Sequence, residues 1–421
     1  METKKLKWYG GKQIKTMIFA GLLFFVSTCM VANSTNSSVP VIANLYGWDA
    51  SMMSMMVGIG LLIAVIFAIF FGRLIVRFGM KPVVFGALIL GALSSLVYGL
   101  TSNFSLFLVC TVINAIACAG YQIVGVTTLI NTWFPRTKGI VLGWVTMGII
   151  LSDVAWIGGV AKLMVSIGVK PVFIAMSVFM VLVALFGLIF IKNTPEEDKT
   201  YPDGDQSGME DLEKTLKAFK EYQSPYTIGK TFKTKQAWQI IIGWGLLWLC
   251  AICYISQEVS RFMSIGYPLE FGQSIMGIAG IFGLIGSWLF GFLDQKLGTK
   301  KASTIYAIWF FLMMIFALLH SVSVVFCYIS AFGISCCAGG ICNLIPSMTG
   351  TIFGRWDFPA ANSVINPCTF AMCAIGIFIG ALLSSRLGFM VTYIIIMVLT
   401  VIAFIIIRCT KDEMIGRKLE L

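Results

Sequence analysis

Long apolar runs separated by short polar segments dominate the pattern along this 421-residue chain. A membrane-spanning helix needs about 20 predominantly apolar residues to cross about 30 Å of hydrocarbon. Twelve runs approach or exceed that length, and the first is too long for a cleaved signal peptide. The predicted spans are roughly residues 14–40, 50–72, 82–101, 104–132, 139–161, 169–191, 236–257, 273–292, 301–320, 323–353, 360–385 and 387–408. The pattern predicts an all-α integral membrane protein with twelve transmembrane helices.

A polar stretch divides these runs into two sets of six. Residues 193–235 begin with a segment rich in acidic residues, proline and glycine, and then carry apolar residues at helical spacing from Leu212 to Phe219. That spacing predicts a short amphipathic helix on the membrane surface. We therefore expect an N-terminal half at 1–192, a linker at 193–235 and a C-terminal half at 236–421.

Composition and charge agree with a membrane protein. With 58% hydrophobic residues and a mean hydropathy of +0.91, the chain has more apolar surface than one soluble core could bury. Its net charge of +11 does not indicate a nucleic-acid partner, because the basic residues lie in short segments between apolar runs. If both termini are cytoplasmic, only four of the 30 basic residues face outward: Lys162, Lys170, Arg261 and Arg386. This asymmetry predicts cytoplasmic termini in the plasma membrane.

The two sets of spans contain a sequence repeat. The segment GRLIVRFGMK at 72–81 follows the second span, and GFLDQKLGTK at 291–300 follows the eighth, at an offset of 219 residues. The same offset relates WFPR at 133–136 to IFGR at 352–355. Two halves related by a parallel repeat, with a cavity between them, are typical of a transporter.

These features resemble the major facilitator superfamily along essentially the whole chain. The resemblance rests on twelve spans in a six-plus-six arrangement and on a Gly-x-x-x-x-basic-x-Gly-x-basic loop after helices 2 and 8. Narrower matches resemble its oxalate/formate antiporter and monocarboxylate transporter branch: GW at 47–48, GRL and RFG within 72–79, NTWFPRTKGIVLG at 131–143 and YTIGKTFKTKQAW before helix 7. The resemblance implies transport of a small organic solute by alternating access.

The repeated loops also depart from the family pattern. In the family loop, an acid normally occupies the fourth x of this motif, directly before the first basic residue. That position is Val76 in the first copy and Gln295 in the second, where Asp294 stands one position earlier. The basic residues can still interact with helix ends and close an inner gate. We expect this gate to include Gly72, Arg73, Arg77, Gly79, Lys81, Arg136, Gly291, Asp294, Lys296, Gly298, Lys300 and Arg355.

Asp153 is an acid in the middle of the fifth span. It lies about 21 Å along the helix from Gly139 at about 1.5 Å per residue, near the middle of the membrane. One interpretation is a protonated packing acid that hydrogen bonds to a neighbour. The other is a proton or cation site, because ionisable groups within a membrane are costly and usually functional.

Other polar residues are candidates for the cavity wall. In the family branch, the resemblance implies that cations on helices 8 and 11 bind the substrate carboxylate, but residues 273–293 and 360–385 contain no Lys or Arg. Arg261 is the best remaining anion anchor, and its pairing with Glu258 is either a surface ion pair or part of an outer gate. The uncharged candidates are Asn33, Asn114, Tyr121, Gln122, Trp156, Tyr254, Gln257, Asn343 and Asn366, which could equally be interhelical hydrogen-bonding residues.

Several chemistries are not expected. Eleven of the twelve cysteines lie in apolar runs, where a thiol is usually a packing residue, and His320 is the single histidine, at a predicted outer loop. There is no Walker GxxxxGK[ST] segment, so we expect no bound nucleotide. We also expect no enzyme activity, cofactor or metal. The sequence predicts a monomeric secondary transporter of a monocarboxylate or other organic anion, by proton symport or exchange. The alternatives are proton-coupled efflux of amphipathic neutral or cationic compounds, and a membrane sensor that does not transport.

Overall fold

The computed structural model describes residues 9–32, 38–205 and 212–417, and every regular element within these ranges is a helix. The first six spans follow the predicted order, although three of them contain a wider π-helical segment. Their bounds are α1 (Gly11–Ser27) with η1 (Thr28–Ala32); α3 (Ala50–Phe78); α4 (Met80–Leu100); α5 (Phe104–Cys118), η2 (Ala119–Val126) and α6 (Thr127–Trp133); α7 (Lys138–Val145), α8 (Met147–Ser152), η3 (Asp153–Val160) and α9 (Ala161–Ile167); and α10 (Val169–Phe190). A separate helix α2 (Ser38–Tyr46) lies where the first predicted span was expected to continue to residue 40.

The remaining helices form the linker and the last six spans. The linker holds η4 (Glu196–Asp198), η5 (Pro202–Gly204), α11 (Leu212–Glu221) and α12 (Ile228–Lys233), so the predicted amphipathic helix is present. The spans are α13 (Lys235–Ser264), α14 (Leu269–Leu297), α15 (Thr299–Leu318) and α16 (Val324–Cys409). Positive φ angles at Gly354 and Gly388 divide α16 into three spans. The eleventh span therefore begins directly after Gly354 and not at residue 360, because this glycine makes the turn.

The repeated loops have the same backbone conformation. Gly79 has φ 86° and ψ 163° before α4, and Gly298 has φ 86° and ψ 152° before α15. This region of φ favours glycine because a Cβ would be strained there. The 219-residue offset in the sequence therefore corresponds to a repeated turn in the structure.

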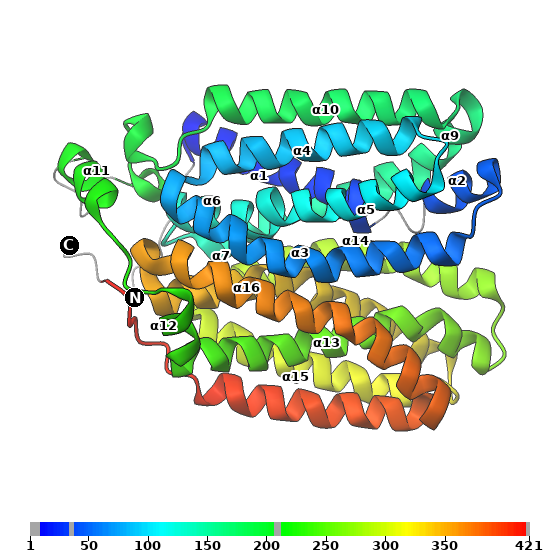
Figure 1. The fold of residues 1–421 in the computed structure, drawn as a ribbon. Coiled ribbons are helices and arrows are strands. Elements are labelled where there is room, and N and C mark those ends of the chain that lie inside the picture. Colours follow the sequence, from blue (N-terminus) through cyan, green and yellow to red (C-terminus); the bar gives the residue numbers. More distant parts are fainter. Residues whose placement is uncertain (1–8, 33–37, 206–211, 418–421) are drawn as a thin grey trace.

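The spans run side by side, with the linker helices at one end of the bundle (Figure 1). The first residues of α1 reach that end, where Gln13 Nε2 donates to Thr200 Oγ1 at 3.1 Å. The C-terminal tail reaches the same end, where the Arg417 backbone N–H donates to Asp357 Oδ2. We call this end the linker face. The opposite end, where α2 and α9 lie, is called the far face (Figure 1).

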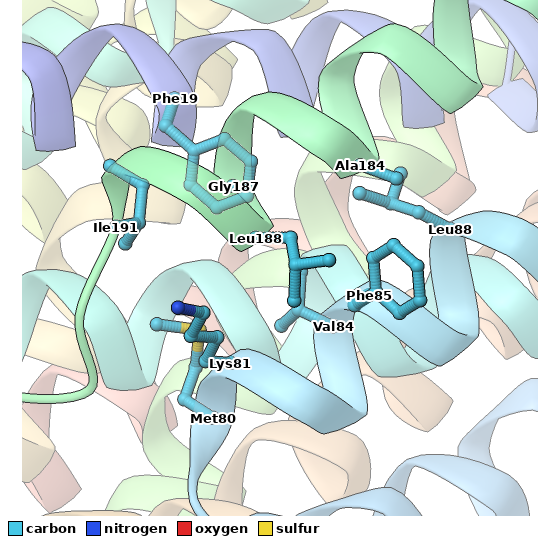
Figure 2. Close-up of a pocket in the computed structure, with 10 residues that line it drawn as sticks. All are labelled: Phe19, Met80, Lys81, Val84, Phe85, Leu88, Ala184, Gly187, Leu188 and Ile191. Carbon is cyan, nitrogen blue, oxygen red and sulfur yellow. The ribbon is translucent and has the colours of Figure 1, made fainter.

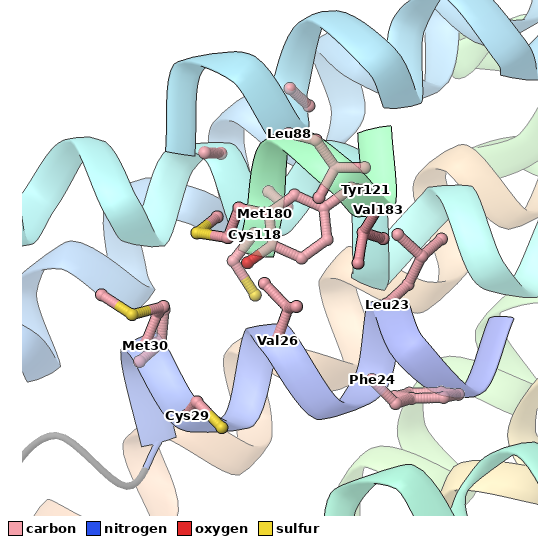
Figure 3. Close-up of a cluster of buried hydrophobic side chains, with 14 of the residues drawn as sticks. Leu23, Phe24, Val26, Cys29, Met30, Leu88, Cys118, Tyr121, Met180 and Val183 are labelled. Carbon is pink, nitrogen blue, oxygen red and sulfur yellow. The ribbon is translucent and has the colours of Figure 1, made fainter. Parts of the chain in front are cut away.

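Each set of six spans has its own buried core. One cluster of buried apolar side chains extends from Phe19 to Ile191, and another from Tyr226 to Ile407. In the first core, Tyr121 lies among Val26, Leu88 and other apolar side chains (Figure 3). We number the twelve spans in chain order as helices 1 to 12, so helix 4 consists of α5, η2 and α6, helix 7 is α13, and helices 10, 11 and 12 are the three parts of α16. Helices 1 and 4 are thus held together by apolar packing.

Candidate functional site: a closed gate at the linker face

Glycines bring the first and last six spans into direct backbone contact. A Cβ on Gly291 in α14 would lie 2.6 Å from the carbonyl oxygen of Gly139 in α7. A Cβ on Gly72 in α3 would lie 2.2 Å from Ser363 Cβ in α16. Gly72 and Gly291 are equivalent positions of the repeat. Each lets one helix approach a helix of the other set more closely than a side chain would permit.

Hydrogen bonds join the same helices deeper in the bundle. Asn343 Nδ2 donates to the Ser287 carbonyl at 2.8 Å, and Ser287 Oγ donates to the Gly143 carbonyl at 3.1 Å. The hydroxyls of Thr146 and Ser287 are also hydrogen bonded to each other. All of these groups are buried. Helix 5 (α7–α9), helix 8 (α14) and helix 10 (the part of α16 before Gly354) therefore meet through buried polar contacts.

Two amides of helix 11 make a second contact across the halves. Asn362 Nδ2 donates to Thr127 Oγ1 at 2.9 Å, and Asn366 Nδ2 donates to the Ile123 carbonyl at 2.7 Å. The Ile123 carbonyl is within the π-helical segment η2. The wider turn of a π-helix disturbs the regular backbone hydrogen bonding, so an amide from another helix can bind there.

Arg355 forms the strongest polar contact at the linker face. Its Nη1 and Nη2 donate to the two carboxylate oxygens of Glu196 at 2.7 and 2.8 Å, and its Nε donates to the Thr132 carbonyl at 2.8 Å. The side chains of Arg355 and Glu196 are 1% and 0% exposed. One guanidinium thus ties the start of helix 11 to the linker and to the end of helix 4.

The next residues of the same turn bind the rest of the linker and the tail. Asp357 accepts hydrogen bonds from Tyr222 Oη at 2.8 Å, Ser224 Oγ at 2.6 Å and the Arg417 backbone N–H at 2.8 Å. The Arg417 guanidinium lies 4.8 Å from the Trp356 ring centroid. Residues 354–357 therefore hold both ends of the linker and the C-terminal tail.

Two further carboxylates anchor the loop before helix 5. Asp203 Oδ1 accepts from the Thr137 backbone N–H at 2.9 Å and Oδ2 from the Arg136 backbone N–H at 3.1 Å. Burial raises the pKa of Asp203 above its usual value, although these hydrogen bonds act in the opposite direction. Asp294 accepts from Thr299 Oγ1 at 2.6 Å and packs against Gly139.

The other basic residues of the predicted gate lie around this contact. Arg73 Nη1 donates to the Tyr226 carbonyl at 3.3 Å, and the Lys81 backbone N–H donates to Asn193 Oδ1 at 2.8 Å. Lys300 is half-buried in the first turn of α15. The exposed residues Arg77 and Lys296 stack on aromatic neighbours, at 5.2 Å from the Phe78 ring centroid and 5.7 Å from that of Phe292.

The predicted cavity residues of the first half are dispersed. Asn33 and the side chain of Asp153 lie outside the described part of the structure; the Asp153 backbone begins η3. Asn114 accepts from Ser95 Oγ at 3.0 Å. Gln122 accepts from Cys118 Sγ at 3.5 Å. The remaining two, Tyr121 and Trp156, are buried in the first core.

In the second half, the residues on helix 7 face two directions. Gln257 accepts from Ser384 Oγ of helix 11 at 3.1 Å. Tyr254 and Glu258 instead point into the second half, where Tyr254 Oη donates to Glu258 Oε1 at 3.4 Å. Among the described residues, no ion pair joins Glu258 to Arg261, whose guanidinium lies 5.7 Å from the Phe389 ring centroid.

Cavities among the described residues lie near the contacts at the linker face. The first is lined mainly by apolar side chains of helices 1, 3 and 6, with Lys81 at its edge, and its volume is only about 10 Å³ (Figure 2). That volume holds at most one water molecule. The second has a volume of about 280 Å³ and is lined by Arg77, Thr132, Glu197, Tyr222 and other residues of both halves and the linker. Its wall therefore combines residues of both sets of spans with residues of the linker.

Comparison with known proteins identifies the family. The model for the Major Facilitator Superfamily matches residues 20–349. The chain belongs to the major facilitator superfamily. It is accordingly a multi-pass membrane transporter and not an enzyme. A search of curated protein sequences finds no match.

Solved structures of this superfamily share the fold. The proton:xylose symporter XylE is similar with a TM-score of 0.73 at 14% identity, over 96% of each chain. The E. coli fucose:proton symporter FucP is similar with a TM-score of 0.73 at 13% identity, over 96% of this chain and 100% of that chain. The human organic anion transporter TETRAN gives a TM-score of 0.70 at 13% identity, over 95% and 100%.

Several residues that make the contacts at the linker face were not predicted from the sequence. Glu196, Asp203 and Asp357 lie in or beside polar segments, where an acid is usually solvated. Their partners are far away in the chain: Asp357 binds Arg417, 60 positions away, and Glu196 binds Arg355, 159 positions away. For Glu196, the acidic run after Pro195 was the available signal. Among the described residues, no group of three His, Cys, Asp or Glu side chains could hold a metal.

Proposed function

We propose that this transporter moves a small organic anion, foremost a monocarboxylate, by alternating access with proton symport or exchange. Its halves, residues 1–192 and 236–421, rock about the solute, and the linker at 193–235 spans them. Both termini and the linker face are cytoplasmic, and the protein functions as a monomer in the plasma membrane.

The observation that supports alternating access is the composition of the gate. The contacts between the halves are hydrogen bonds between small polar groups and close glycine crossings, as at Asn362–Thr127 and Gly139–Gly291. A hydrogen bond contributes about 1 kcal/mol net, because its groups otherwise bind other partners. Such contacts can close one face firmly and still be exchanged for contacts at the other face.

The substrate class rests on the motif resemblance in the sequence. Arg261 supports it as a cation with no ion-pair partner among the described residues, beside the aromatic ring of Phe389. The similar solved structures include two sugar:proton symporters and one organic anion transporter. At 13–14% identity, these structures support the fold alone. Two of them are proton symporters, which is consistent with the proposal.

Proton-coupled efflux of an amphipathic neutral or cationic compound is the second candidate, and the mid-membrane position of Asp153 favours a cationic one. A cation site needs a residue that keeps its charge, whereas a proton carrier needs one that changes its charge. Asp153→Asn should therefore abolish binding of a cationic solute in the efflux case. In the symport case it should abolish pH-driven accumulation and leave exchange down a gradient intact.

Transport by the purified protein in proteoliposomes tests the proposal. Radiolabelled lactate should accumulate against its gradient when the exterior is acidified, and unlabelled lactate inside should accelerate its entry. Accumulation of a cationic dye with no lactate transport would support the efflux candidate. Specific solute binding without any flux would support the sensor interpretation and contradict the proposal.

A further inference from the structure

Four buried polar side chains form a hydrogen-bonded series in the second half, outside the gate. Tyr254 Oη lies 3.4 Å from Glu258 Oε1 and 3.1 Å from Ser330 Oγ, and Ser330 Oγ lies 2.6 Å from His320 Nε2. They come from helix 7, helix 10 and the turn before helix 10. Their exposed fractions are 2% for Glu258, 1% for His320 and 0% for the other two.

The carboxyl at one end of this series lacks a compensating charge. Arg261 is one helical turn away but forms no ion pair with Glu258, and among the described residues only Tyr254 donates to this carboxyl. A buried, ionised carboxylate without a partner costs several kcal/mol. Binding of a proton removes that cost, since a neutral carboxyl needs only its hydrogen bond.

The histidine at the other end is close to the far face. His320 is in the turn between α15 and α16, beside Ser321 and Val322, which is 71% exposed. Its Nδ1 is buried and has no hydrogen-bond partner among the described groups. Burial, assisted by the charge of Arg261, lowers the pKa of His320 to about 3, so the ring is neutral and can both accept and donate a proton.

Other groups also contact the series. Ser330 Oγ lies 2.8 Å from the Phe326 carbonyl and 3.1 Å from the Cys327 carbonyl, so its hydroxyl must turn away from them to donate to Tyr254. Arg261, Cys327 and Tyr393 are the other ionisable groups that interact electrostatically with its members. The rings of Phe262 and Tyr393 lie 5.3 and 6.1 Å from the His320 ring, centroid to centroid. Aromatic rings therefore form part of the surroundings of the series.

We propose that Glu258 is a proton-binding site of the second half, loaded from the far face through His320, Ser330 and Tyr254. In the structure Tyr254 Oη is the donor in its contacts with both Ser330 Oγ and Glu258 Oε1, and its one proton serves one of them at a time. When Glu258 is ionised, the hydroxyls turn so that His320 Nε2–H donates to Ser330, Ser330 to Tyr254 and Tyr254 to Glu258. A proton that arrives at His320 Nδ1 moves each of these protons one bond onward. Glu258 becomes protonated, Nε2 loses its proton, and exactly one proton has been taken up. Use of this proton for coupling rests on the proposed function, but its binding does not.

Difference infrared spectroscopy on the full chain in lipid tests the binding site. The wild type should lose a protonated-carboxyl C=O band between acidic and alkaline pH. Glu258→Gln, which keeps the side-chain shape, should lack that band. The matched control Glu270→Gln, an exposed acid in the first turn of α14, should retain it. A band of wild-type intensity in a folded Glu258→Gln protein would overturn the proposal.

The pathway is tested by the speed of the same band after a rapid change of pH. Tyr254→Phe and His320→Ala should each slow its response and leave its final amplitude unchanged. Wild-type rates in both variants would overturn loading through this series. Because the spectra need no substrate, they distinguish a failure of this proposal from a failure of the proposed function, which is measured by lactate flux.

Discussion

The pair of Arg355 and Glu196 should determine whether the linker face is closed. When that face opens, helix 11 must move away from the end of helix 4, so Arg355 must leave the Thr132 carbonyl and its place beside the linker. Glu196→Gln removes the negative charge but keeps the size of the side chain. In the closed state the Arg355 guanidinium, 1% exposed, would then be a buried cation without a counter-charge.

The magnitude follows from that burial. Removal of one partner from a buried, hydrogen-bonded ion pair costs about 3–5 kcal/mol, and an amide that keeps one acceptor oxygen places the cost near the lower value. About 3 kcal/mol corresponds to roughly a 100-fold change in an equilibrium constant. In the open state the substitution costs little free energy, because Arg355 is solvated there. We therefore expect Glu196→Gln to favour the open linker face by roughly this factor.

Pulsed EPR measures this equilibrium directly. Spin labels at the exposed positions Lys15 and Lys301 report the separation of the two halves at the linker face, with exposed Cys409 replaced by serine. Glu196→Gln should shift the distance distribution to longer values. The matched control is Glu221→Gln, because Glu221 pairs with Lys217 at 4.0 Å with both side chains mostly exposed. Such a surface pair contributes little, so the control should resemble the wild type.

A second variant separates the charge effect from damage to the linker. The double variant Glu196→Gln with Arg355→Gln removes both buried charges and should return part of the distribution to the closed distance. If Glu196→Gln gives the same distribution as Glu221→Gln, the buried pair does not stabilise the closed gate. If the double variant is more open than Glu196→Gln alone, burial of an unpaired charge is not the cause.

Further predictions concern packing, pH and orientation. Gly291→Ala should open the linker face, since its Cβ would lie 2.6 Å from the Gly139 carbonyl oxygen, whereas Gly280→Ala on the same helix has open space and should not change the EPR distances. The free energy of unfolding should fall as the pH decreases from about 6.5 toward about 3, because the unfolded chain binds a proton at His320 that the folded chain excludes. The loss from His320 is at most about 1.4 kcal/mol per pH unit. His320→Gln should remove this component, and a variant whose thermal stability has the wild-type pH profile would contradict the prediction. A reporter fused within 193–235 should be cytoplasmic, and an external signal would reverse the proposed orientation.

Sequence patterns predicted the helices because the membrane imposes a simple requirement on them. Each crossing needs a long apolar run, and this requirement predicted the twelve spans, although residue 40 lies in the separate helix α2 and not in the first span. The repeat also predicted equivalent turns, and Gly79 and Gly298 have the same positive φ. The error at residue 360 arose because Pro359 lies inside the helix, while Gly354 makes the turn.

The candidate site was less accessible to this reasoning. The sequence placed Arg355 in the gate region, but Glu196 was simply one acid in a polar linker until the fold buried it against Arg355, 159 positions away. Likewise, Tyr254 and Glu258 share a helical face in the sequence. Nothing in the sequence indicates that this face packs on His320 and Ser330.

The sequence by itself determined which segments enter the membrane, where the repeated turns lie and to which superfamily the motifs point, because these depend on local composition and spacing. Only the tertiary structure decided which polar groups lose water and which partner each one finds. Polar side chains such as Asn362 and Glu196 can be solvated, pair within a half or join the halves, and the sequence does not distinguish these outcomes. Their energies depend on burial and on contacts between residues far apart in the chain, which exist only after the helices have packed.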